Sequence, residues 1–96
     1  MASSAETSLV DLPGHDLVSR GRADLDLGHE TIEALLVSIG APRLLRLGIP
    51  VRAPIHDAEL RLYALLAADD ADSAHSRYNA LVRRLVSFER AAECAS

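Results

Sequence analysis

Residues 73–94, SAHSRYNALVRRLVSFERAAEC, decide the fold because they have the pattern of one long amphipathic helix. At the helical repeat of about 100° per residue, apolar side chains form one stripe and polar side chains fill the rest. The stripe consists of Tyr78, Leu81, Val82, Leu85, Phe88 and Ala92. Apolar surface contributes roughly 25 cal/mol per Å² only when it leaves water. The helix must therefore pack against the rest of the chain or against another protein.

The composition favours helices packed on helices. The chain has 96 residues, of which 49% are hydrophobic, enough for one domain with a core. Only Tyr63, Tyr78 and Phe88 are aromatic, so aliphatic side chains and alanine must fill the interior. We predict an all-α fold, a compact bundle of four longer helices plus one short helix in residues 11–94, after a disordered tail at 1–10.

Proline, glycine and acidic residues mark the ends of the other helices. They predict helices over 13–26, 29–39 and 57–68 and a short helix over 42–47. Gly40 is expected to take the left-handed conformation after a helix. Asp57 is expected to cap the helix that follows it, and Asp72 or Ser73 the last helix.

The helix at 57–68 is apolar over an unusually wide arc. Its apolar residues include Leu60, Leu62, Tyr63, Leu65, Leu66 and Ala67. We expect it to be buried on two sides, to lie centrally and to pack antiparallel to the last helix. The connector before it, residues 49–56, contains Pro50 and Pro54, which favour extended backbone at Ile49 and Ala53. Gly21 either weakens its helix or allows a close neighbour.

Charge and cysteine content exclude several classes of function. The net charge is −4 and all ten basic residues are arginine, which disfavours nonspecific binding to nucleic acid or to an anionic membrane. No stretch is apolar enough to span a bilayer or to serve as a signal peptide, so we expect a cytoplasmic protein. Cys94 is the only cysteine, which excludes an intrachain disulfide and a cysteine-rich metal site.

The chain has no pattern typical of catalysis. Its four histidines each fall near a predicted helix start, but no pair has the i, i+4 spacing that would place two metal ligands together. No serine or cysteine has a glycine elbow, and no glycine-rich loop would hold phosphate. The acidic turn at 69–72 favours a solvated cap over an acid–base or calcium site. We therefore predict no enzyme activity, no catalytic residue, no metal and no cofactor.

Two groups of arginines are candidates for binding. Residues 29–47 resemble a helix-turn-helix whose second helix would present Arg43 and Arg46 to DNA, although that helix has only about six residues. Four further arginines lie on the outer face of the last helix and suit an acidic partner or an RNA backbone, namely Arg77, Arg83, Arg84 and Arg90. A solvated face is the alternative for these four, because they flank the apolar stripe in two rows.

Glu89 is unusual because it falls on the apolar side of the last helix, near Tyr78, Val82 and Leu85. An unpaired buried carboxylate is costly. We expect it to reach solvent or to pair with an arginine or the Tyr63 hydroxyl.

Two stretches carry a family resemblance. The stretches EALLVSIGAPRL at residues 33–44 and AHSRYNALVRRLVSF at residues 74–88 resemble small conserved hypothetical proteins of actinobacteria, including mycobacteria. That family has no assigned activity, so no functional residue carries over. The resemblance implies a compact all-helical protein of a bacterial cytoplasm.

The function that we predict from these observations is a noncatalytic protein-interaction or regulatory module, a monomer or weak homodimer with an unknown protein partner. DNA binding through residues 29–47 is the alternative. An interaction module should expose an apolar patch, which we expect near Tyr78 or along the connector at 49–55.

Overall fold

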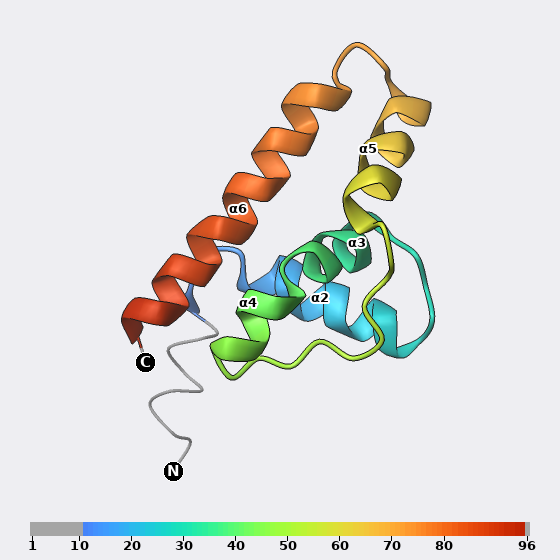
Figure 1. Cartoon of the computed structure of the whole chain (residues 1–96). Coiled ribbons are helices and arrows are strands. Elements are labelled where there is room, and N and C mark those ends of the chain that lie inside the picture. Colours follow the sequence, from blue (N-terminus) through green and yellow to red (C-terminus); the bar gives the residue numbers. More distant parts are fainter. Residues whose placement is uncertain (1–10, 96) are drawn as a thin grey trace.

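The computed structural model describes residues 11–95, and all regular structure in them is helical. The helices are α2 (His15–Asp26), α3 (Ile32–Ile39), α4 (Ala41–Arg46), α5 (Ala58–Asp69) and α6 (Ala74–Ala95). Figure 1 shows the helices coloured along the sequence, from blue at α2 to red at the end of α6. The predicted all-α bundle of four longer helices and one short helix is confirmed. The tail predicted at 1–10 lies outside the described residues.

Helix α3 is the centre of the core. Residues 34–37 of this helix are completely buried, and α2, α5 and α6 all pack against it. Its sequence, IEALLVSI, is apolar nearly all round, as a helix covered on every side must be. The prediction that the helix at 57–68 is central is wrong, because α3 takes that place.

Helices α2 and α3 approach each other closely at Gly21. A Cβ atom added to Gly21 would collide with the Glu33 carbonyl oxygen and would lie 2.7 Å from Val37 Cγ1. The missing side chain therefore lets the two backbones touch. Of the two roles that the sequence allows for Gly21, close contact with a neighbour is the one that the structure shows.

Helix α3 begins at Ile32, three residues later than predicted, because Thr31 caps it. The Thr31 hydroxyl accepts a hydrogen bond from the Ala34 amide at 3.1 Å and donates one to Asp24 Oδ2 at 2.6 Å. This is the usual N-cap arrangement, and it also ties α3 to α2. The first helix likewise begins late, at His15 rather than residue 13.

Gly40 does not have the predicted left-handed conformation. Its φ is −85°, because the chain passes directly from α3 into α4, and the Leu44 amide donates to the Gly40 carbonyl. Space rather than φ requires glycine here, since an added Cβ would lie 3.0 Å from Glu89 Oε2 and from Leu85 Cδ2. Left-handed glycines do end α2 and α4, at Gly28 and Gly48.

The connector between α4 and α5 is anchored to the core. Ile49 is buried, and Val51 and Ile55 pack against the core. The Ile55 amide donates to Ser38 Oγ at 2.9 Å, and Arg22 Nε donates to the Pro50 carbonyl at 3.0 Å. Ile49, Val51 and Ile55 thus pack on the core, whereas Pro54 of the same connector is exposed.

Two residues of the connector differ from prediction. Ala53 has a φ of 51°, not the extended backbone expected before Pro54. Asp57 precedes α5 but has a φ of 57°, and its side chain does not cap the helix. Between these two residues the Ile55 amide is bonded to Ser38 Oγ. This tertiary contact overrides the local preference.

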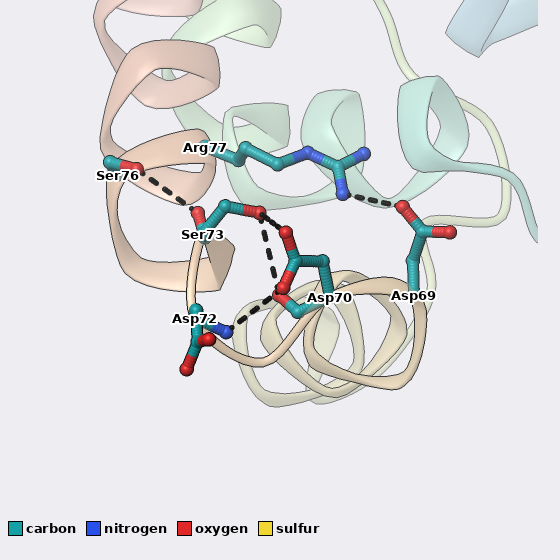
Figure 2. A network of polar contacts seen from close by, with 6 residues as sticks. All are labelled: Asp69, Asp70, Asp72, Ser73, Ser76 and Arg77. Atoms are coloured by element: carbon teal, nitrogen blue, oxygen red, sulfur yellow. Dashed lines mark hydrogen bonds and ion pairs between the residues drawn. The ribbon is translucent and has the colours of Figure 1, made fainter.

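The turn between α5 and α6 is held by Asp70, as Figure 2 shows. Its carboxylate accepts from the Asp72 amide at 3.2 Å and from Ser73 Oγ at 2.9 Å. Ser73 occupies the predicted N-cap position of α6, since its carbonyl accepts from the Arg77 amide at 2.9 Å, and its hydroxyl donates to Asp70. Arg77 Nη1 donates to Asp69 Oδ2 at 2.8 Å and joins the two helices.

Helices α5 and α6 are antiparallel neighbours, as predicted, and extend beyond the other helices (Figure 1). We call residues 62–82 the arm. The arm gives the molecule its elongated shape, with principal extents of 46 × 25 × 19 Å. Near its base the apolar stripe of α6 is buried at Leu85, Phe88 and Ala92, whereas Tyr78, Leu81 and Val82 are only half-buried.

We predict that Gly21→Ala lowers the free energy of unfolding by about 1 to 3 kcal/mol. Alanine favours the helix by roughly 0.5 to 1 kcal/mol, but its methyl group must displace the backbone of α3, which is the larger effect. Urea unfolding followed by circular dichroism measures the change. Ser19→Ala, at an exposed position of the same helix, is the control and should change little. Equal stability of Gly21→Ala and the original chain would show that α2 and α3 are not in contact there.

Candidate protein-interaction surface

Helix α5 has apolar side chains on two opposite sides. On the inner side Ala58, Leu62 and Leu66 are buried against the core. On the outer side Leu60, Tyr63, Ala64 and Ala67 follow the i, i+3, i+4, i+7 spacing of one helix face. We call these four residues the outer stripe.

The outer stripe is only partly exposed in the described structure. Leu60 is 74% exposed and Tyr63 is 40% exposed, whereas Ala67 packs against the core. The predicted burial on two sides is therefore incomplete, since the second side of the helix is only partly covered. Large apolar side chains that align on one exposed helix face are typical of surfaces that another molecule covers.

A hollow of about 600 Å³ adjoins the outer stripe at the base of α5. Leu60 forms part of its wall, and the other apolar walls are Ile39, Pro42, Pro54 and Ile55. The hollow is open to solvent and brings together the end of α3, the start of α4 and the end of the connector. Its shape suits an apolar side chain inserted from outside.

The charged side chains around the hollow are mostly acidic. Asp57 and Glu59 are carboxylates, and His56 is the only other titratable residue that lines the hollow within residues 11–95. None of the arginines in the described chain lines it. The hollow therefore combines apolar walls with negative charge.

Serine, histidine and aspartate all line the hollow, but they do not form a catalytic triad. Ser38 Oγ donates to the Ala34 carbonyl at 2.8 Å and accepts from the Ile55 amide at 2.9 Å. The His56 side chain is 96% exposed and lies 3.5 Å from Asp57. A nucleophile needs a base within hydrogen-bond reach, and Ser38 is instead a structural link.

Tyr63 joins the outer stripe to α6. Its ring lies 5.8 Å from the ring of Tyr78, at an interplanar angle of 56°. Burial, and secondly the negative charge of Glu59, raise the pKa of the Tyr78 hydroxyl. The patch expected near Tyr78 is therefore found next to it, on α5.

The four arginines predicted on α6 do not act as one group. Arg77 is bound to Asp69, and Arg84 lies 3.9 Å from Asp16 of α2. Arg83 and Arg90 are exposed. Two of the four thus connect α6 to neighbouring elements.

Arg43 and Arg46 also lie apart from the α5 surface. Arg43 Nη2 is 3.4 Å from Glu93 Oε2, so the Arg43 guanidinium has a carboxylate beside it. Both arginines line a separate hollow with Leu47 and Glu93. Helix α4 has only six residues, and Leu44 among them is buried in the core. This is short for a helix that reads bases in the DNA major groove.

Glu89 lies inside the protein rather than at Tyr63. It is 4% exposed, and its Oε2 atom lies against the space above Gly40, which glycine leaves free. Burial raises the pKa of this carboxyl, while the nearby positive charge of Arg43 lowers it to a smaller extent. The predicted access to solvent is not found, because Glu89 is buried, and Arg43 acts on it through its charge.

Two further features of the described chain bear on binding. No three histidine, cysteine or acidic residues among 11–95 lie together in a way that would hold a metal ion. No helix in the same range is long and apolar enough to cross a bilayer.

Comparison of the chain with protein-family models, with curated proteins and with solved structures gives no match. The resemblance to actinobacterial proteins therefore stays a prediction.

The hollow was missed from the sequence because its walls come from segments up to about twenty residues apart. The outer stripe had a signal, the excess of apolar residues at 57–68. That signal was interpreted as burial within the chain.

We predict that the outer stripe contributes little to stability. Leu60→Ala should change the free energy of unfolding by less than about 0.5 kcal/mol, because Leu60 is mostly exposed. Leu62→Ala, the matched control on the inner side, should cost about 2 to 5 kcal/mol. Thermal or urea unfolding of both variants tests this. A similar large loss for both would mean that Leu60 is buried in solution.

Glu89→Gln should raise stability at neutral pH by about 1 kcal/mol. The folded-state pKa of Glu89 is raised, so folding favours its protonated form. The stability gained from the protonated carboxyl is present below the pKa of Glu89 in the unfolded chain. It is lost as pH rises through the pKa of Glu89 in the folded protein. The gain from glutamine should therefore shrink on acidification to about pH 4, where Glu89 is itself protonated.

Unfolding curves at several pH values measure this effect. Glu93→Gln, one turn further along α6, is the control. It should give no gain, because Glu93 is exposed and bound to Arg43. A Glu89→Gln variant that is less stable than the original chain at neutral pH would contradict the assignment.

Proposed function

We propose that this protein is a noncatalytic protein-interaction module and that the outer stripe of α5, together with the hollow at its base, is its docking surface. The observation that carries the proposal is the exposure of Leu60 and Tyr63 on one face of a helix whose opposite face is already buried. Apolar surface of this kind is stabilised when another protein removes it from water.

The form of the surface supports a reversible interaction. One helix face and one hollow offer much less area than the roughly 2,000 Å² or more of an obligate dimer interface. We therefore expect a monomer or weak homodimer that meets a separate partner. The exposed free thiol of Cys94 suits a reducing compartment, so we place the interaction in the cytoplasm.

DNA binding through residues 29–47 gains no support from the contacts of α4. The pairing of Arg43 with Glu93 places a negative charge where a phosphate would bind. The acidic net charge acts in the same direction. The α5 surface is therefore the better candidate.

Site-specific photo-crosslinking in the producing cells tests the proposal. A photoreactive phenylalanine analogue at position 60 should crosslink to one protein partner. The same analogue at position 27 is the matched control, because Leu27 is 69% exposed but lies in the turn after α2 and does not line the hollow. We expect a discrete crosslinked product from position 60 and much less from position 27. Equal or absent crosslinking at the two positions would refute the docking surface.

A further inference from the structure

We propose that the segment that docks on α5 is a cationic amphipathic helix, with leucine-like side chains on one face and lysine or arginine beside them. This inference rests on the proposed function, and it names the chemistry of the partner. It follows from the spacing of the apolar groups and from the sign of the charges around them.

The apolar geometry fits a helix laid along α5. From Leu60 to Ala67 the outer stripe runs over two helical turns, about 10 Å at 1.5 Å per residue. A partner helix with the same i, i+3, i+4, i+7 pattern can place its apolar side chains along this stripe. The hollow beside Leu60 accepts the side chain at one end of that helix.

The charges fit a cationic partner. Asp57 is 60% exposed at its side chain, and Glu59 is exposed. The arginine on the same helix, Arg61, is already bound to Glu30 at 2.8 Å, and Arg77 at the far end is bound to Asp69. Arg61 and Arg77 are thus each bound to a carboxylate of the chain. Asp57, which lies 3.5 Å from the exposed His56, and Glu59 are open to lysine or arginine from outside.

The same charges disfavour a second copy of this chain as the occupant. A symmetric dimer through the outer stripe would bring Asp57 and Glu59 of both copies to one interface. Like charges at an interface oppose association. A partner with lysine or arginine removes this repulsion and adds attraction.

A synthetic probe tests the inference on the full chain. The probe is a fluorescent 14-residue amphipathic peptide of leucine and lysine, and the control peptide has glutamate in place of lysine. We expect the lysine peptide alone to bind, with an affinity that falls as salt rises. Leu60→Ala should weaken its binding about tenfold, the loss expected for a buried leucine-sized contact.

Charge variants distinguish binding of the lysine peptide at the α5 surface from its nonspecific attraction to an acidic protein. Asp57→Asn with Glu59→Gln should weaken binding of the lysine peptide about 3- to 10-fold. Asp11→Asn with Asp26→Asn changes the net charge equally at two exposed positions away from the hollow and should have little effect. Equal losses from both pairs, or equal binding of the two peptides, would overturn the inference.

The crosslink at position 60 distinguishes this inference from the proposed function. In the Asp57→Asn, Glu59→Gln background the yield of the crosslinked partner should fall. An undiminished yield would overturn the cationic partner while leaving the docking surface in place. A crosslink only to a second copy of the chain would also overturn it. No preference for position 60 over position 27 would overturn the proposed function itself.

Discussion

The contact between α2 and α3 at Gly21 is the constraint on which the rest of the structure depends. Because Gly21 lacks a side chain, the backbone of α3 lies directly beneath α2, and the Glu33 carbonyl and Val37 touch it. Helix α3 then becomes the interior of the protein, with residues 34–37 fully buried. The other helices are arranged by what α3 leaves for them to cover.

The short length of α3 explains the arm. Eight residues make a helix of about 12 Å, whereas the twelve of α5 reach about 18 Å and the twenty-two of α6 about 33 Å. The longer helices therefore cover α3 at one end and extend past it at the other, where they have only each other. The inner side of α5 is used in this packing, whereas on the outer side Leu60 stays exposed, Tyr63 meets Tyr78 of α6 and Ala67 packs against the core. The exposed apolar face is thus a consequence of the architecture and the place where function is expected.

Several features that first suggest chemistry have structural roles instead. Ser38 connects α3 to the connector, and Arg77 connects α6 to Asp69. Arg43 is paired with Glu93. The contacts within the chain give each of these side chains a structural role. The outer stripe and its hollow have no such role in the fold.

The sequence predicted the local structure well and the tertiary burial less well. Apolar periodicity, together with proline and glycine at the helix ends, located all five described helices, because a helix repeats its faces regardless of what covers them. Periodicity also showed that α5 is apolar on two sides, but it could not tell whether the second cover belongs to this chain. The conformation of Gly40 differs from prediction because α3 passes directly into α4, and Asp57 precedes α5 with a φ of 57° and no side-chain cap.

An NMR titration of the isotope-labelled full chain with the leucine–lysine peptide, following each backbone amide, tests most directly whether the outer stripe and its hollow form the docking surface. We expect the chemical-shift changes to concentrate on Ile39, on residues 55–60 and along the outer stripe, while the shifts of α2 stay unchanged. Shift changes spread evenly over the acidic surface, or centred on α2 or α4, would contradict it.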